Sequence, residues 1–290
     1  MWALARAGSS PALGTTKNRG HHWVPVVFFK GESAVRIAIY QMNMEWEKPA
    51  KNVEKIKKAA RKAASWGSKI LLTPELSIST FTKNPSKVTL TEEMEISLEE
   101  ISRDISIGVG FFDFQDGKAF NSYAIFSKGK QLCKYRKIHL FSHGGEDGIC
   151  HPGDHLINCE LENVMFSIFI CYDLRFPCPF QRLAEKTHVF VVPANWPEKR
   201  ISHWKILLKA RAVENQSFVV GVNRSGKDSF FVYGGSSMVI DPWGEEIISL
   251  SVEESLIFVD IDIDKLERIR ENFPVLPDRR EEVDNLHFHV

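Results

Sequence analysis

The sequence lacks several features that would indicate whole classes of protein. Its 290 residues include 37 basic and 37 acidic side chains, so there is no overall basic field to attract nucleic acid or anionic lipid. No apolar run approaches the roughly 18 residues that a membrane-spanning helix needs, the longest being 24–29 and 166–171. No repeat of fixed short period is present, which disfavours solenoids and propellers. We therefore expect a globular protein that binds neither nucleic acid nor membrane.

The sequence also lacks a disulfide framework. It has five cysteines, an odd number, with no CxxC pair and no evident secretion signal before them. These are Cys133, Cys150, Cys159, Cys171 and Cys178. This usage favours a reducing compartment, and we expect the protein to be cytoplasmic.

Residues 1–34 differ in character from the rest of the chain. Gly, Ser, Pro and Thr are scattered through them without helical or alternating periodicity. We expect this segment to be a disordered N-terminal arm, or the product of a mistaken start codon. The length of the remainder, 35–290, leaves one or two domains open.

From residue 35 onward, strand and helix patterns alternate. The apolar patterns predict β-strands at 35–42, 69–73, 105–114, 119–126, 131–135, 164–170, 188–193, 218–223, 236–240, 246–250 and 255–261. Helical spacing predicts helices at 48–66, 91–103, 176–186, 201–216 and 264–271. This order indicates an α/β protein with two sheets covered by helices.

Three polar residues lie just beyond apolar strands, where α/β folds place groups that handle ligands. They are Glu75, Lys137 in the string KYRKIHLF, and Cys171 before YDLRFP. A thiol at a strand-to-helix turn faces the positive end of the helix, so we expect a lowered pKa and a nucleophilic sulfur at Cys171. Glu75 can take the thiol proton, and Lys137 can stabilise an oxyanion. Taken singly, each has an ordinary alternative, which is a buried inert thiol or a solvated surface charge.

Taken together, the three motifs resemble the nitrilase superfamily of carbon–nitrogen hydrolases. The PE dipeptide after LLT, the string KYRKIHLF and the string CYDLRFP agree with that family in order and spacing over about 35–280. The resemblance implies a four-layer α-β-β-α sandwich and one domain over 35–290. It also implies Cys171 as nucleophile, Glu75 as general base and Lys137 as oxyanion partner, without metal or organic cofactor.

The resemblance implies further site residues. The family often has a second glutamate in the loop before a glycine, and Glu146 before Gly153 matches it. That residue can position Lys137 or accept a proton. The backbone N–H of Tyr172 is implied as a second oxyanion donor.

The strings VPANWP and HWKILLKARAVENQ resemble the ω-amidase branch, whose members release ammonia from 2-oxoglutaramate or 2-oxosuccinamate. Such substrates carry a carboxylate, for which Arg175 or Arg200 offers a bidentate partner. Asn195 and Trp196 are expected to line the pocket. A family glycine after the PE dipeptide is missing, since LSISTF carries Ser79 and Thr80. An N-carbamoyl amino acid amidohydrolase, or another aliphatic amidase or nitrilase, is the alternative.

Two other classes of function stay open at this stage. A zinc site is conceivable at a group of loop residues, although their spacing is not that of known ligand sets: His139, His143, Cys150 and His151. A catalytically inactive binding module on the same fold is the other. Because family members commonly pair through the region of 201–216, where Trp204 and Leu208 form an apolar face, we also expect a homodimer or higher homo-oligomer.

Overall fold

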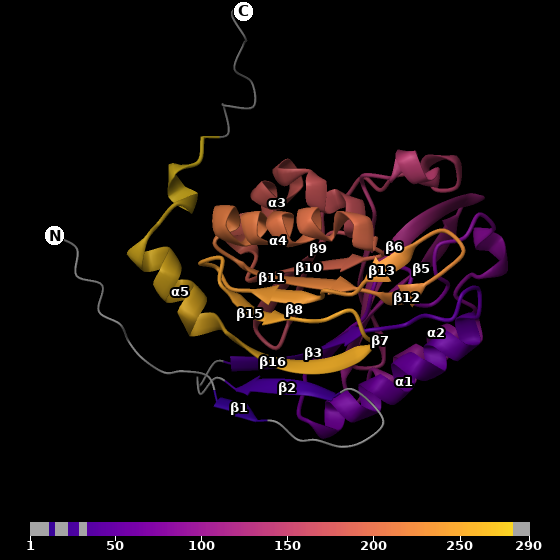
Figure 1. Cartoon of the computed structure of the whole chain (residues 1–290), viewed down its shortest axis with the longest axis horizontal. Coiled ribbons are helices and arrows are strands. Elements are labelled where there is room, and N and C mark those ends of the chain that lie inside the picture. The colour runs from indigo at the N-terminus through magenta and orange to yellow at the C-terminus, as the bar shows by residue number, and fades with distance from the viewer. Residues whose placement is uncertain (1–11, 15–22, 29–33, 281–290) are drawn as a thin grey trace, which may run out of the picture.

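Two mixed β-sheets pack against each other between two layers of helices (Figure 1). The computed structural model describes residues 12–14, 23–28 and 34–280. The helices α1 (Pro49–Ser65) and α2 (Glu92–Ile101) cover one sheet, and α3 (Pro177–Leu183) and α4 (Ile201–Asn215) cover the other. A fifth helix, α5 (Ile263–Asn272), follows the last strand. The α-β-β-α architecture expected from the sequence is thus confirmed.

The first sheet has the strand order β1-β2-β16-β3-β4-β5-β6-β7. Its strands are β1 (Ala12–Gly14), β2 (Trp23–Phe28), β3 (Ala34–Gln41), β4 (Ile70–Leu72), β5 (Ser106–Gln115), β6 (Lys118–Ser127), β7 (Lys130–Arg136) and β16 (Ser255–Asp262). The strands β3, β4 and β5 are parallel, whereas β5, β6 and β7 are antiparallel. The sheet therefore becomes mixed at the point where the sequence pattern changes.

The second sheet has the order β15-β14-β11-β10-β9-β8. Its strands are β8 (Asn158–Leu161), β9 (Val164–Ile168), β10 (Val189–Ala194), β11 (Phe218–Asn223), β14 (Met238–Ile240) and β15 (Glu246–Ser249). A separate hairpin is formed by β12 (Ser225–Lys227) and β13 (Val232–Gly234). The short strands β8, β12 and β13 were not predicted, because their sequences NCEL, SGK and VYG contain no apolar run like ILL of β4 or MVI of β14.

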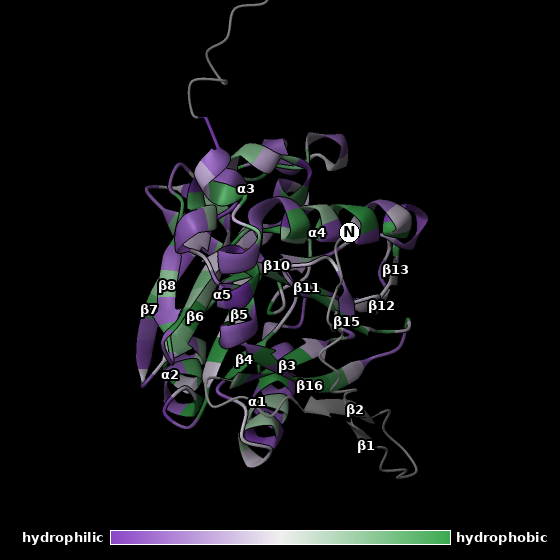
Figure 2. Ribbon diagram, turned by 90° about the vertical axis from the view of Figure 1, so that its left-hand side faces the viewer, coloured by the Kyte–Doolittle hydropathy of each residue, from purple (hydrophilic) through white to green (hydrophobic). Residues whose placement is uncertain are grey.

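The core lies between the sheets and beneath the helices. In Figure 2 the hydrophobic colour follows β3 and β4, and the helices around them are mixed. Helix α1 buries Val53, Ile56, Ala60 and Ala63, the positions that helical spacing predicts. No helix in the described residues is long and apolar enough to cross a membrane.

The apolar face of α4 belongs to this core. Trp204 and Leu208 are fully buried, and a Cβ added to Gly221 of β11 would lie 2.5 Å from Leu208 and 2.7 Å from Trp204. Trp204 and Leu208 are therefore core residues and are not available as a pairing surface. The helix uses this face to pack tightly onto the second sheet.

The N-terminal segment differs from the arm that we expected. β2 pairs with β16, and β1 pairs with β2, so residues 12–14 and 23–28 are strands at the edge of the first sheet. Backbone N–H and C=O groups along β16 would otherwise lack partners on that side, and β2 supplies them. The other residues before 34 lie outside the described part of the chain. A single domain over 35–290 stays a prediction.

Candidate active site

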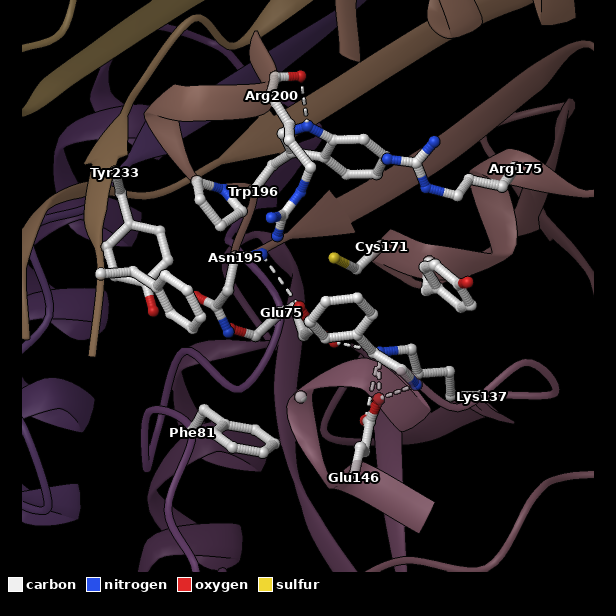
Figure 3. A pocket seen from close by; sticks show the side chains of 15 residues that line it. Glu75, Phe81, Lys137, Glu146, Cys171, Arg175, Asn195, Trp196, Arg200 and Tyr233 are labelled. Atoms are coloured by element: carbon white, nitrogen blue, oxygen red, sulfur yellow. Dashed lines mark hydrogen bonds and ion pairs between the residues drawn. The ribbon is translucent and has the colours of Figure 1, made fainter. Parts of the chain in front are cut away.

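The ends of three strands meet at one pocket, which Figure 3 shows from close by. Glu75 follows β4, Lys137 follows β7 and Cys171 follows β9, and all three line a pocket of about 70 Å³. The other residues predicted from the resemblance also line it: Glu146, Tyr172, Arg175, Asn195 and Trp196. The structure therefore brings together every predicted site residue, from positions far apart in the sequence.

Lys137 lies between two carboxylates. Its Nζ donates to Glu75 Oε1 at 2.8 Å and to Glu146 Oε2 at 2.8 Å, and its side chain is 2% exposed. Burial alone lowers the pKa of Lys137, but the negative charges of Glu146 and Glu75 outweigh it and hold that pKa well above its ordinary value. Lys137 is therefore a fixed positive charge inside the pocket.

Glu146 is held by the loop that carries it. It begins a short 3-10 turn, Glu146–Gly148, and its Oε2 accepts the backbone N–H of Phe141 at 2.7 Å. The loop returns to Lys137 at Gly153, whose N–H donates to the Lys137 carbonyl at 2.8 Å. A Cβ at Gly153 would lie 2.3 Å from the Arg136 carbonyl oxygen, which explains the glycine. Of the two roles considered for Glu146, this geometry suits the positioning of Lys137.

Asn121 is a site residue that the sequence reasoning missed. It lies on β6, is 1% exposed, and its Nδ2 donates to Glu75 Oε1 at 2.8 Å and to Glu146 Oε1 at 2.7 Å. Its own carbonyl accepts the backbone N–H of Lys137 at 2.9 Å. The available signal was an asparagine inside an otherwise apolar strand pattern, which is costly to bury without partners.

The Glu75 carboxylate is fixed from both sides. Asn195, at the end of β10, donates its backbone N–H to Glu75 Oε2 at 2.9 Å and its side-chain Nδ2 to the Glu75 carbonyl at 3.1 Å. On the other side, a Cβ at Gly110 of β5 would lie 2.3 Å from the backbone nitrogen of Leu76. Only a glycine lets β5 approach this turn so closely. Asn195, predicted as a pocket wall, is thus also a support for Glu75.

The chain turns sharply after Glu75. Leu76 and Thr80 both have left-handed backbone conformations, with φ of 46° and 64°. Glycine adopts this region without strain, whereas a β-branched threonine does not. Ser79 and Thr80 are fully buried, and Phe81, directly after them, lines the pocket. In the segment where the resemblance implies a glycine, Thr80 thus takes a strained backbone conformation that leads into the pocket wall.

Cys171 begins a 3-10 turn, Cys171–Arg175, with φ of 46°. Such a conformation persists in a residue other than glycine only where its surroundings hold it in place. Here the buried Asp173 carboxylate closes the turn by accepting the backbone N–H of Ile170 at 3.0 Å. The thiol is thereby directed into the pocket, towards Glu75 and Asn195 (Figure 3).

The pKa of the Cys171 thiol differs from our expectation. Burial raises it well above its ordinary value, and the charge of Glu75 raises it further, against the opposing effect of Lys137. The helix dipole does not compensate, because a five-residue 3-10 turn, rather than a long helix, follows the thiol. The prediction of a lowered pKa is therefore wrong.

The outer part of the pocket is aromatic and positively charged. The Arg175 guanidinium lies over the Trp196 ring at 4.9 Å, and the Arg200 guanidinium lies over the Phe141 ring at 5.4 Å. Neither arginine forms an ion pair within the described residues. Arg175 Nη2 lies 3.4 Å from His203 Nδ1, its one polar side-chain contact within the described residues. Both guanidinium groups are available to an anion.

The loop histidines do not gather around a common centre. His139 Nδ1 lies 2.8 Å from Asp173 Oδ1, and its ring stacks on Phe176 at 3.8 Å. His143 contacts Phe141, and His151 contacts Phe120. Within the described ranges there is no group of three or more His, Cys, Asp or Glu side chains that could hold a metal ion.

Comparison with known proteins defines the class. Residues 36–271 match the family model described as carbon-nitrogen hydrolase, so the chain belongs to that family. It is a hydrolase of carbon–nitrogen bonds.

Individual relatives are consistent with this. The 2-oxoglutaramate amidase of Bacillus subtilis (strain 168) is 36% identical over 171 residues, which are 58% of this chain and 66% of that protein. The omega-amidase NIT2 of Homo sapiens is 30% identical over 270 residues, 87% of this chain and 97% of NIT2. The crystal structure of XC1258 from Xanthomonas campestris, a CN-hydrolase superfamily protein, matches with a TM-score of 0.81 at 27% identity and covers 86% of this chain and 98% of its own. The resemblance to the nitrilase superfamily and its ω-amidase branch is confirmed.

Proposed function

We propose that this protein is an ω-amidase, which hydrolyses the terminal amide of a small 2-oxo dicarboxylic monoamide such as 2-oxoglutaramate or 2-oxosuccinamate. The observation that carries the proposal is the pair Arg175 and Arg200, which have no acidic partner in the described part of the chain and line the pocket of Cys171. The names of the Bacillus and human relatives support the same substrate class.

The charges in the pocket favour an anionic substrate. Its ionisable lining consists of two acids, Glu75 and Glu146, and three bases, Lys137, Arg175 and Arg200, beside a neutral thiol. The acids are both engaged by Lys137, so one positive charge is left over. A substrate with a single carboxylate and an uncharged amide neutralises it. An uncharged aliphatic amide or nitrile would leave both guanidinium groups without an anionic partner.

The first half of the reaction is acyl transfer to Cys171. Glu75 takes the thiol proton as the sulfur attacks the amide carbon, and the C=O electrons move onto oxygen. Lys137 Nζ and the backbone N–H of Tyr172 stabilise that oxyanion, each donor contributing about 3 kcal/mol to the lowered barrier. The first amides of a helical turn have no acceptor within it, which leaves the N–H of Tyr172 free for this. Glu75 then protonates the nitrogen, and ammonia leaves.

The second half is hydrolysis of the thioester. Glu75, again a carboxylate, removes a proton from water, and the resulting hydroxide attacks the thioester carbon. Lys137 Nζ and the backbone N–H of Tyr172 stabilise the oxyanion that this second attack forms. The C–S bond breaks, the thiolate recovers its proton from Glu75, and the 2-oxo dicarboxylate is released. No step requires a redox change.

The test is ammonia release from 2-oxoglutaramate, 2-oxosuccinamate, glutamine, N-carbamoyl amino acids and simple nitriles, with Cys171→Ala as control. We expect the 2-oxo monoamides to give the highest kcat/KM and the variant to be inactive. A preference for N-carbamoyl amino acids would favour the alternative amidohydrolase. Full activity of Cys171→Ala would refute the thiol mechanism.

We also propose that the protein forms at least a homodimer through the outer face of α4. Ile206 and Val213 on that face are 65% and 52% exposed. Trp243 and Phe273 are likewise exposed, pack on each other at 5.8 Å, and adjoin Val213 through Gly244. Light scattering should give a dimeric mass for the wild type and a monomeric mass for Val213→Glu; a wild-type monomer at micromolar concentration would contradict the proposal.

The cytoplasm remains the proposed location. All five cysteines are unpaired in the structure, which suits a reducing compartment. Cell fractionation with an antibody against the protein tests this, and recovery in an oxidising compartment would contradict it.

A further inference from the structure

The two buried carboxylates of the site share one neutral donor. Asn121 Nδ2 lies 2.8 Å from Glu75 Oε1 and 2.7 Å from Glu146 Oε1, so its two N–H bonds are directed to two different acids. Lys137 is the only other side chain in the described part of the chain that donates to both. Two carboxylates and one ammonium leave a net negative charge in a site where all three side chains are almost fully buried.

The two carboxylate oxygens of Glu75 accept hydrogen bonds from different donors. Oε1 accepts from both Lys137 and Asn121, which occupies its two lone pairs. Among the residues that the structure describes, Oε2 accepts only from the backbone N–H of Asn195, at 2.9 Å. Asn195, which donates to Oε2, lies beside the Cys171 sulfur (Figure 3), so Oε2 is the oxygen on the side of the sulfur. The vacant lone pair of Glu75 is therefore next to the group whose proton it must take.

Neighbouring buried carboxylates tend to share a proton, because two like charges at short range are unfavourable. A shared proton would leave Glu75 occupied before the thiol can be deprotonated. The Asn121 N–H groups present positive dipole ends to both acids and carry no proton that can be transferred. Their geometry keeps each carboxylate directed to the amide rather than to the other carboxylate.

We propose that Asn121 is the positioning residue of this site: it occupies Glu75 Oε1 together with Lys137, reserves Oε2 for the Cys171 proton, and prevents Glu75 and Glu146 from sharing a proton. This role rests on the proposed thiol mechanism with Glu75 as base. It does not depend on which amide is the substrate.

The test compares the pH profiles of kcat/KM for Asn121→Asp, Asn121→Ala and Asn121→Ser with that of the wild type. Asn121→Asp keeps the shape of the side chain but adds a third carboxylate to the site. We expect kcat/KM at neutral pH to fall at least tenfold, and the acidic limb of the profile to move to higher pH by about one unit or more. Asn121→Ala should move the limb in the same direction by less. Asn121→Ser, which retains one donor, should lie between Asn121→Ala and the wild type.

Ser122→Ala is the matched control. Ser122 is the next residue on β6, is fully buried, and its hydroxyl has no hydrogen-bond partner within the described residues. We expect its profile to match that of the wild type.

A uniform loss of activity in the Asn121 variants, with the acidic limb unmoved, would show a merely structural role and overturn the proposal. Wild-type activity in Asn121→Ala would overturn it as well. The profiles are measured with whichever amide the wild type hydrolyses best, so a wrong substrate class and a wrong role for Asn121 give different results. Thermal unfolding of each variant identifies any that do not fold, and Asn121→Ser, the mildest change, then decides.

Discussion

The Asp173 carboxylate accepts the backbone N–H of Ile170 at 3.0 Å and so closes the turn that presents Cys171. The same carboxylate accepts the hydroxyl of Tyr135 at 2.8 Å and the backbone N–H of His139 at 2.8 Å. Tyr135 and His139 lie two residues on either side of Lys137. One buried acid thus connects the segment that carries the lysine to the turn that carries the nucleophile.

Replacing Asp173 with Asn should therefore affect both stability and catalysis. The amide would place an N–H₂ group against donors that now meet a carboxylate, so we expect a loss of about 3 kcal/mol in the free energy of unfolding. Denaturant unfolding measures this, and kcat should fall more than KM rises. Tyr135→Phe removes one of these hydrogen bonds and should cost about 1 kcal/mol. Wild-type stability of Asp173→Asn would contradict this account.

The Cys171 thiol should titrate at unusually high pH. Burial and the charge of Glu75 raise its pKa, so the thiol is protonated at neutral pH and the thiolate fraction grows only above the ordinary range of about 8.5. Ultraviolet absorbance of the thiolate, or the pH dependence of iodoacetamide alkylation, reports this. The exposed Cys178 serves as the internal reference.

Glu75→Gln tests whether the negative charge of Glu75 raises the pKa of the Cys171 thiol. It removes a negative charge that raises the pKa of Cys171, so the thiolate should form at lower pH in the variant although turnover is lost. A thiolate titration unchanged by Glu75→Gln would mean that the two groups do not interact.

Most of the fold, and the meeting of Glu75, Lys137 and Cys171 in one pocket, could be predicted from the sequence because their signals are local. Apolar runs ending in Glu75 and Cys171 indicate strand ends, and the sandwich brings such ends together. Lys137 follows a strand in the same way. The buried apolar positions of α1 follow from its helical spacing alone.

What could not be predicted depends on contacts between distant segments. Asn121 acquires its role only when β6 lies beside Glu75 and Glu146, from positions that the sequence gives no reason to connect. The raised pKa of Cys171 follows from burial, whereas the local pattern indicates the effect of a helix end. The β2 strand overlaps the apolar run at 24–29, but that run alone gives no sign that it pairs with β16.

Gly110 should be essential for the position of Glu75. A Cβ there would lie 2.3 Å from the backbone nitrogen of Leu76, and neither backbone can move without displacing the turn that carries Glu75, the proposed general base. We expect Gly110→Ala to lower stability by about 3 kcal/mol and to reduce kcat strongly. Gly148→Ala is the matched control, because a Cβ at that position meets no atom within 4 Å. Equal stability of the two variants, measured by thermal unfolding, would show that the approach of β5 is not constrained.

Arg175 and Arg200 should govern the affinity for the substrate carboxylate. Each guanidinium contributes a charge-assisted hydrogen bond of about 1.5–3 kcal/mol, so Arg200→Ala and Arg175→Ala should each lower kcat/KM for 2-oxoglutaramate roughly ten- to a hundredfold. Hydrolysis of an uncharged primary amide should change far less, and the ratio of the two activities is the measurement. Lys199→Ala is the control, because Lys199 is a neighbouring cation that does not line the pocket. If neither arginine variant changes that ratio, the carboxylate of the substrate is held elsewhere, and the two guanidinium groups serve only to pack against Trp196 and Phe141.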